Sequence, residues 1–407
     1  MHLSHDLSLE PRAETLTDPV EAFVRERVLG RELRLDDRPK APSRQYQEFV
    51  ERGLDNWWVP KAQGGRGLSL SESVDIVDAL AYGDAGLALS LFIAVIGSTV
   101  IDLYGSEAHK RRCLGALARG GVTSATLGSE RLAGSELLRM ATAARREGDE
   151  WVLDGEKYFS TNAGIADHWL VIARDVARDE LRGFVVEDPL TRPGVEVLRR
   201  WPMIGVRSSA TYELRLRGCR VPADAALEGN GVRLLEIGLN PSRTLIAACA
   251  LGIARRIRDL CLDYAQDKRV KGEALIDNAV FAAKLGQVQM DIDTMRCVCK
   301  AAARDFDALR GRSDAAAVFM AAGSLASTVT AKVVCGQIGW RVASVGSEMF
   351  GGLGYTEDSL IGKLVRDMRY VSVVEGGEDV LRDYVYNRSV LPADMRRRAL
   401  EGRGGAR

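Results

Sequence analysis

The amino-acid sequence predicts an α+β protein in which a helical region, a β module and a long helical bundle follow one another. Apolar residues are spaced as in helices up to about residue 119, as in short strands over residues 120–232, and as in helices again over residues 233–395. We therefore expect an N-terminal helical domain over residues 1–119, a small middle β-barrel or sandwich, a C-terminal four-helix bundle, and a basic tail over residues 396–407. Segregated modules of this kind disfavour a βαβ fold.

The first region contains one loop, residues 59–69, whose proline and glycines interrupt the helical spacing. Ser69 or Ser71 is expected to cap the helix that follows, with Glu72 in its first turn. The most apolar run, residues 87–101, is about fifteen residues long. Because a membrane-spanning helix needs about 20 apolar residues, we expect this run to form a buried helix instead.

The middle region has the two-residue periodicity of strands. Within residues 211–217, apolar and charged side chains alternate, as expected for a half-buried strand. Residues 151–161 are expected to form a hairpin that turns at Asp154 and Gly155. Several such strands at close spacing favour a small antiparallel barrel or sandwich.

The last region contains long amphipathic stretches. Over residues 246–264 and 285–299, apolar residues recur at every third or fourth position. Residues 314–346 are rich in Ala and Val and carry little charge, which is typical of a helix buried on several sides. A fourth helix is expected after Glu375, and four such helices would pack as a bundle.

Composition and motifs narrow the function classes. Lys plus Arg equal Asp plus Glu at 56 each, so the overall charge favours neither nucleic acid nor a membrane surface as partner. The 7 cysteines lack the spacing of a disulfide framework, and the start of the chain lacks a secretory signal pattern, so we expect reduced thiols in a cytoplasmic protein. The sequence has no G-x-G-x-x-G after a strand, no phosphate-loop lysine motif and no G-x-S-x-G turn.

No metal site is expected either. Cys297 and Cys299 form the closest cysteine pair, but residues two apart on a helix face different ways. The 4 histidines form no ligand pattern, and His2 and His5 lie at the N-terminus.

The segment over residues 348–388 carries the most specific pattern for a reaction site. Glycines, a charged pair and a glutamate occur in it in this order: Gly351, Gly352, Gly354, Arg366, Asp367, Glu375 and Gly376. The glycines suit close backbone approach and positive φ. Because Glu375 precedes two glycines, a flexible turn would let its carboxylate project into a pocket.

Three other segments accompany this one. Residues 127–137 read LGSERLAGSEL, residues 156–174 begin with EKYFSTNAG, and residues 238–254 contain NPSR, which ends at Arg243. The four segments together resemble the acyl-CoA dehydrogenase family, and the resemblance extends over residues 21–388.

The resemblance implies an enzyme that uses FAD to oxidise the α,β carbon–carbon bond of an acyl thioester of CoA or of an acyl-carrier protein. Glu375 would remove the α-proton, and the β-hydrogen would pass as hydride to flavin N5. Burial beside the flavin and substrate should raise the pKa of Glu375 towards neutrality. Some family members place the base at the position of Ser242, but a serine cannot act as this base unaided, so the role falls to Glu375.

The resemblance also implies which residues bind. The expected FAD-binding residues are Leu127, Ser129, Phe159, Thr161, Lys268, Arg269, Glu348, Gly351 and Gly352. The expected substrate-binding residues are Ser135, Arg243 and Gly376. Lys268 stands where the family often has Arg, and it or Arg269 could meet a phosphate as a point charge. Glu348 stands where the family has Gln, and it would oppose an anionic pyrophosphate that it faced. Replacements of this kind in the cofactor site are commoner in biosynthetic members of the family, including those of secondary metabolism.

The family builds its FAD site across subunits, so the resemblance implies a homodimer or homotetramer and an electron-transfer acceptor as partner. Two alternatives stay open. One is a flavin oxidase or monooxygenase of the same fold. The other is a scaffold or lyase that has lost FAD, which the replacements at Lys268, Ala279 and Glu348 would permit.

Overall fold

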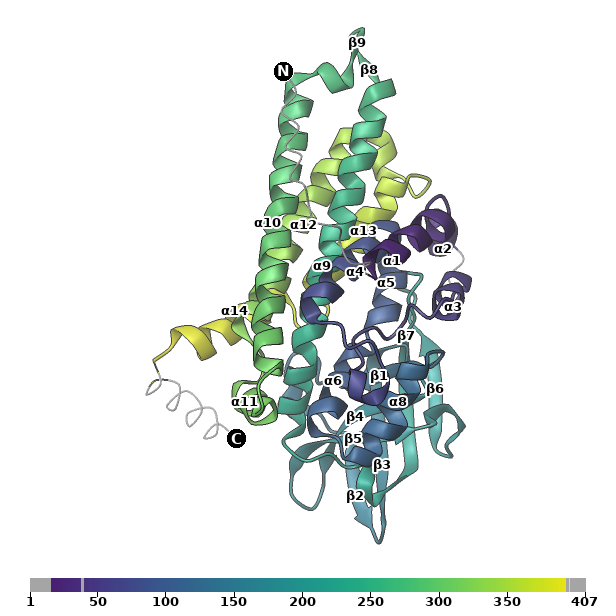
Figure 1. The fold of residues 1–407 in the computed structure, drawn as a ribbon, viewed down its shortest axis with the longest axis vertical. Helices are drawn as coiled ribbons and strands as arrows, with labels where there is room; N and C mark the ends of the chain where they lie inside the picture. The colour runs from purple at the N-terminus through teal and green to yellow at the C-terminus, as the bar shows by residue number, and fades with distance from the viewer. Residues whose placement is uncertain (1–15, 38–39, 393–394, 396–407) are drawn as a thin grey trace.

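The computed structural model describes residues 16–37, 40–392 and 395, and it has the predicted α+β organisation (Figure 1). The β-sheet lies at one end of the molecule, and the long C-terminal helices extend from it to the hairpin of β8 (Arg269–Val270) and β9 (Glu273–Ala274) at the other end. The predicted basic tail over residues 396–407 lies outside the described residues, as do His2 and His5.

Short helices form the N-terminal part: α1 (Thr17–Phe23), α2 (Glu32–Asp37), α3 (Arg44–Glu51), α4 (Leu70–Gly83), α5 (Ala85–Phe92), α6 (Val95–Tyr104), α7 (Glu107–His109) and α8 (Gly115–Arg119). Ser69 caps α4, as expected. Its Oγ accepts from the backbone N–H of Glu72 at 3.1 Å, and Glu72 Oε2 accepts from the backbone N–H of Ser69 at 2.8 Å. This reciprocal capping box fixes where the helix begins after the glycine-rich loop.

The apolar run that was expected to form one buried helix forms two, α5 and α6, separated by a short turn at Ile93 and Ala94. Its burial is confirmed, because the most apolar window of Ala85–Tyr104 is 89% buried inside the protein. Among the described residues, Ala85–Tyr104 is long and apolar enough to cross a membrane, and the bent pair Ala315–Ala322 and Ala326–Tyr355 adds a second candidate if it is counted as one span.

One sheet of seven strands forms the middle part, in the order β1-β4-β2-β3-β7-β6, with β5 paired to β4. The strands are β1 (Ser124–Leu127), β2 (Ala143–Glu147), β3 (Glu150–Thr161), β4 (His168–Asp175), β5 (Glu180–Glu187), β6 (Val195–Arg200) and β7 (Thr211–Pro222). Strands β1 and β2 run parallel to β4, and the other pairs are antiparallel. Trp169 and Phe184 lie in a hydrophobic core that belongs to this sheet.

The predicted hairpin at Asp154 and Gly155 is wrong. Residues 150–161 form the single strand β3, and its pairing with β7 shifts register between Leu153 and Gly155. A Cβ at Gly155 would lie 2.5 Å from Thr142 Oγ1, so the glycine allows a close crossing of the neighbouring chain. The Asp-Gly pair lies opposite a β-bulge whose extra residue belongs to β7, because Asp154 alone faces two residues there. An Asp-Gly pair is also a common turn signal, which explains the wrong prediction.

The C-terminal part consists of α9 (Gly231–Asp267), α10 (Ala279–Arg310), α11 (Ala315–Ala322), α12 (Ala326–Phe350), α13 (Leu360–Val373) and α14 (Glu378–Val385). Helix α9 packs against α10, α12 and α13, which together form the bundle, and also against α4 and α6. Two expectations fail here. The single helix over residues 314–346 is broken at Gly323, whose φ is +69°. The fourth bundle helix, α13, precedes Glu375, and the helix after Glu375 is the short α14.

The N-terminal helices and the bundle share one continuous hydrophobic core, to which Ile172 of β4 and Val185 of β5 also contribute. The neighbouring residues of these strands point to the other face of the sheet, which has the separate core described above. Gly238 of α9 shows how closely the two helical parts meet, because a Cβ there would lie 2.7 Å from the carbonyl oxygen of Ile96 in α6. The predicted domain limits fall between α8 and β1 and in the first turn of α9. They stay predictions.

Candidate active site

Glu375 lies in the turn that joins α13 to α14. Its φ is +55°, an unusual value for a residue with a side chain, and Gly376 follows with φ +103°. The turn is therefore strained, and neighbouring groups must hold it. Such strain is common where a structure fixes a reacting group.

The carboxylate of Glu375 has one oxygen engaged and one free. Ser242 Oγ, on α9, donates to Glu375 Oε1 at 2.5 Å. Glu375 Oε2 is buried and has no hydrogen-bond partner among the described residues. A buried, unpaired carboxylate oxygen is costly and is rarely left without a purpose.

Two cations hold the backbone of the same turn. Arg243 donates from Nε and Nη2 to the carbonyl oxygen of Glu375, at 3.2 and 3.0 Å, and from Nη1 to Ser324 Oγ at 2.7 Å. Lys332 of α12 donates from Nζ to the carbonyl oxygen of Gly376 at 2.6 Å. Sequence reasoning singled out Arg243 but missed Lys332, although a lone lysine in the Ala- and Val-rich stretch before Gly339 was a usable signal.

The electrostatics of the turn suit a base that works near neutral pH. Burial raises the pKa of Glu375 to about 7, against the lowering effects of the Ser242 hydrogen bond and the charges of Arg243 and Lys332. Burial also lowers the pKa of Lys332 to about 8, against the raising effect of Glu375. The raised pKa of Glu375 agrees with the expectation from the sequence. A carboxylate with a pKa near 7 can accept a proton from carbon and later release it.

The predicted cofactor residues of the sheet form a half-exposed aromatic and hydroxyl cluster. The ring of Phe159, 51% exposed, lies 4.8 Å from that of Trp201 with a tilt of 36°. Thr161 Oγ1 lies 3.1 Å from Thr211 Oγ1. Trp201 was missed in the sequence because nothing in the motifs connected it with Phe159. An exposed ring beside hydroxyl groups fits a planar flavin ring, which needs an aromatic face and hydrogen-bonding groups at its edge.

A buried lysine supports the loop that carries Ser129. Lys157 Nζ donates to the carbonyl of Gly128 at 3.0 Å and lies 2.8 Å from Glu130 Oε1. The carbonyl of Ser129 accepts from the backbone N–H of Tyr158 at 2.9 Å, which ties this loop to β3 beside Phe159. Two further predicted residues lie as follows: Leu127 is buried at the end of β1, and Ser135 is exposed in the next loop. Between Leu127 and Ser129, a Cβ at Gly128 would lie 3.1 Å from the side chain of Leu235 in α9.

The other predicted cofactor residues lie at the far end of the bundle. Stacked rings of Tyr264 and Phe350, 4.5 Å apart, bring the ends of α9 and α12 together. The residues concerned are Lys268, Arg269, Glu348, Gly351 and Gly352. Lys284 Nζ lies 3.2 Å from Glu348 Oε2, so a cation partly balances the carboxylate that replaces Gln. A Cβ at Gly351 or Gly352 would meet nothing within 4 Å, which leaves the backbone open to a ligand.

One chain does not bring the two groups of cofactor residues together. Lys268 follows Arg243 by 25 residues along α9, which corresponds to roughly 37 Å of helix. Figure 1 shows the same separation, with the sheet at one end and the β8–β9 hairpin at the other. The structure therefore places the two groups of predicted cofactor residues at different ends of one chain.

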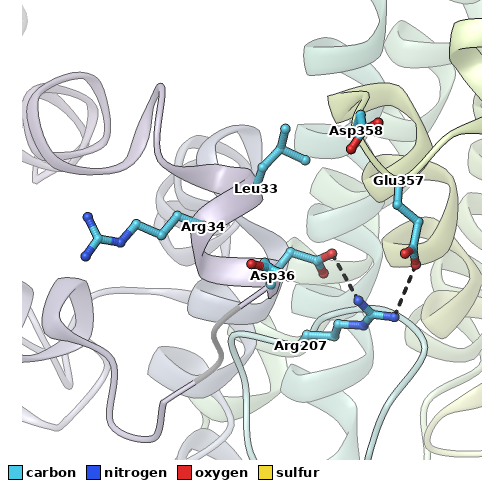
Figure 2. Close-up of a pocket in the computed structure, with 7 residues that line it drawn as sticks. Leu33, Arg34, Asp36, Arg207, Glu357 and Asp358 are labelled. Atoms are coloured by element: carbon cyan, nitrogen blue, oxygen red, sulfur yellow. Dashed lines mark hydrogen bonds and ion pairs between the residues drawn. The ribbon is translucent and has the colours of Figure 1, made fainter.

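Two adjoining cavities lie away from Glu375. The larger, of about 600 Å³, is lined by Leu33, Arg34, Asp36, Asp37, Arg207, Glu357 and Asp358. Figure 2 shows Arg207 between Asp36 and Glu357, at 3.5 and 3.7 Å. The smaller, of about 430 Å³, shares Asp36 and Arg207 and reaches Trp201. Neither cavity contains a predicted site residue, and Arg207, which lines both, is already paired with Asp36 and Glu357.

The chain matches three family models that together cover most of its length. They are acyl-CoA dehydrogenase, N-terminal domain, over residues 10–121; middle domain, over residues 125–219; and C-terminal domain, over residues 229–390. A probable acyl-CoA dehydrogenase of Mycobacterium tuberculosis is 27% identical over 395 residues, which cover 95% of this chain and 98% of that protein. A probable acyl-CoA dehydrogenase of Mycobacterium leprae is 27% identical over 377 residues, with 91% and 93% covered.

Solved structures share the fold. Butyryl-CoA dehydrogenase from Megasphaera elsdenii superposes with a TM-score of 0.82 at 24% identity, covering 92% of this chain and 98% of that chain. The prolyl acyl carrier protein oxidase AnaB superposes with a TM-score of 0.81 at 22% identity, covering 91% and 96%.

Proposed function

Because the chain belongs to the acyl-CoA dehydrogenase family, we propose that it oxidises the α,β carbon–carbon bond of an acyl thioester, with Glu375 removing the α-proton. The family consists of oxidoreductases that act on CH–CH bonds, and this chain is an enzyme of that class. The observation that carries the assignment of the base is the free, buried Oε2 of Glu375 on a carboxylate with a pKa of about 7.

The residues around Glu375 have separate parts in the proposed proton removal. Ser242 engages Oε1, so the lone pairs of Oε2 are left for the α-hydrogen. Arg243 and Lys332 fix the two carbonyls of the turn, so the backbone N–H of Glu375 can point at the thioester carbonyl and stabilise the charge that develops there. Gly376 and Ser135 would contact the thioester and its pantetheine arm.

FAD would be held by residues from two copies of the chain. Leu127, Ser129, Phe159 and Thr161 of one copy would surround the flavin, and the bundle end of the other copy would meet the phosphates and adenine. That bundle end contributes Lys268, Arg269, Glu348, Gly351 and Gly352. When bound, FAD supplies the acceptor for the β-hydrogen. Because Lys284 lies beside Glu348, the carboxylate at this position is compatible with an anionic cofactor.

The partners follow from this reaction. We propose a CoA or carrier-protein thioester as substrate, an electron-transfer acceptor, a homodimer or homotetramer, and action in the cytoplasm. The place of the enzyme in secondary metabolism is also a proposal, which the replacements at Lys268 and Glu348 support.

The test is the absorption spectrum of the purified protein, followed by anaerobic addition of acyl-CoA and acyl-carrier-protein thioesters. We expect visible flavin bands that bleach with one class of thioester. A protein that binds no flavin even after FAD is added would overturn the proposal in favour of a non-redox scaffold or lyase.

A flavin oxidase is the second candidate, because an acyl-carrier-protein oxidase shares the fold. Rapid oxygen consumption in the absence of any other electron acceptor would favour it. Slow oxygen consumption with fast thioester bleaching would favour the dehydrogenase.

A further inference from the structure

Lys332 is a buried cation whose presence the bundle core does not explain. Its side chain is 0% exposed, and it lies on α12 in a stretch where most neighbours are Ala, Val, Ser and Thr. Its Nζ donates to the carbonyl oxygen of Gly376, one residue after Glu375. Burying an ammonium group costs several kcal/mol unless it is paired, and a neutral donor could satisfy one carbonyl at lower cost.

The charges around Lys332 come from three elements. Glu375 of the turn and Glu378 at the start of α14 favour its charged form, whereas Arg243 of α9 opposes it. Glu378 also accepts from Gln337 of α12 at 2.9 Å, so part of its charge is already engaged. Two further titratable groups come from other elements packed against α12: Cys299 of α10, whose Sγ lies 3.7 Å from that of Cys335, and Tyr370 of α13, whose pKa burial raises. Asp291 of α10 is paired with Arg341 of α12 at 2.7 Å.

We propose that Lys332 is a positioning residue for the base: it fixes the Glu375–Gly376 turn through the Gly376 carbonyl, and its charge biases Glu375 towards the proton-accepting carboxylate. The inference rests on the proposed role of Glu375. The two effects differ in origin, since the first needs a hydrogen-bond donor and the second needs a positive charge.

Three substitutions separate the two effects. Lys332→Arg keeps charge and donor, Lys332→Gln keeps a donor without charge, and Lys332→Met removes both. The control is Thr330→Ala, which shortens an exposed side chain of α12 close to Lys332 in the chain. Each protein is loaded with FAD, and the rate of anaerobic flavin reduction by an acyl thioester is followed from acid to alkaline pH.

For the wild type we expect the rate to rise with pH through the pKa of Glu375. Lys332→Gln should move this rise upward by about one pH unit and leave the maximal rate within a few-fold, since an opposite charge nearby typically lowers a carboxyl pKa by about one unit or more. Lys332→Met should move the rise to higher pH by the same amount. It should also lower the maximal rate about tenfold or more, because the base is then misplaced. Lys332→Arg and Thr330→Ala should keep the wild-type pH dependence.

A second readout does not depend on turnover. In glutamate-labelled protein without substrate, the carbon resonance of the Glu375 carboxyl, assigned by its loss in Glu375→Gln, should titrate at higher pH in Lys332→Gln. If Lys332→Met does not fold, the Gln and Arg variants still decide the question. Unchanged titration and rate profiles in Lys332→Gln would overturn the inference. Failure of the wild type to reduce its flavin would instead overturn the proposed function.

Discussion

Ser242 and Glu375 are 133 residues apart in the sequence and are joined by a 2.5 Å hydrogen bond from the serine Oγ to the carboxylate Oε1. The bond comes from α9 of the bundle and reaches the turn between α13 and α14. It fixes which oxygen of Glu375 is free. In the proposed mechanism, Ser242 would therefore orient the base, and it would do so from the position where the family resemblance implies an alternative base.

The Ser242→Ala variant should raise the pKa of Glu375 above about 7, because the hydrogen bond stabilises the charged form. A hydrogen bond to a charged group contributes about 1.5–3 kcal/mol, and one pKa unit is about 1.4 kcal/mol, so we expect the acid limb of the rate profile to move up by about one to two units. The measurement is flavin reduction against pH. Ser344→Ala, the same change on the exposed face of α12, is the control. An unmoved acid limb would show that Ser242 does not tune the base.

The Arg243→Lys variant should lower the maximal rate of flavin reduction about tenfold or more while FAD stays bound. Lysine keeps the positive charge but lacks the planar guanidinium group. The guanidinium donates from two nitrogens to the Glu375 carbonyl and from a third to Ser324. The strained turn would then relax, and a small displacement of the base is costly. The rate of flavin reduction is measured by rapid mixing, and the amount of bound FAD is measured by absorbance. A rate equal to that of the wild type would mean that the turn holds its own shape.

The separation of the cofactor residues predicts complementation between two inactive chains. The double variant Phe159→Ala with Thr161→Ala should lose the contacts that bind the flavin ring. The double variant Lys268→Glu with Arg269→Glu should repel the phosphates, because it reverses the charge at that end of the bundle. When the two double variants are produced together, each mixed dimer contains one intact site, so flavin should return at about one FAD per mixed dimer. The readout is flavin absorbance per chain, with each double variant alone as the baseline. If the mixture binds no more flavin than its parents, one chain builds the whole site.

The pairing of Lys363 with two buried carboxylates predicts a large effect on stability. Lys363 Nζ lies 2.9 Å from Asp84 Oδ2 and also pairs with Asp367, which accepts from the backbone N–H of Val206 at 2.6 Å. Lys363→Met should lower the free energy of unfolding by about 3–5 kcal/mol, because both carboxylates lose their counter-ion. Arg382→Ala, which breaks partly exposed pairs of α14, should cost about 1 kcal/mol or less.

The stability that Lys363→Met loses should also depend on pH. Burial raises the pKa of Asp367 even with the lysine present, so without the lysine this carboxyl protonates more readily in the folded protein than in the unfolded chain. The deficit should therefore be largest above neutrality and shrink as the pH falls. Chemical denaturation at several pH values measures it. A deficit that does not change with pH would show that the carboxylates are not what the lysine compensates.

Much of the architecture was predictable because it depends on periodicity, which is local. The α+β order and the cap at Ser69 follow from residue spacing alone. What failed were features that depend on distant neighbours. Asp154-Gly155 lies within a strand opposite a bulge of β7, and residues 314–346 break at Gly323, where the chain turns with positive φ.

The residues of the candidate site also fall into those that a local motif indicates and those that depend on distant neighbours. Glu375 and Arg243 were found through motif resemblance, and the pKa of the glutamate agrees with its expected burial. Lys332 and Trp201 were missed because each acts on a residue far along the chain, at Gly376 and beside Phe159. The separation of Lys268 from Phe159 could not be read from a sequence, since it depends on the length of α9 as folded.

The most direct test of Glu375 as the base is anaerobic flavin bleaching by an acyl thioester in the Glu375→Gln variant. Glutamine keeps the size of the side chain and can still bond with Ser242, but it cannot accept the α-proton. Asp379→Asn, an exposed change in the first turn of α14, is the matched control. We predict that Glu375→Gln binds FAD as the wild type does and that its bleaching falls by at least a thousandfold, roughly the upper half of what acid–base catalysis contributes. Bleaching at a rate comparable to that of the wild type would contradict the assignment of Glu375 as the base.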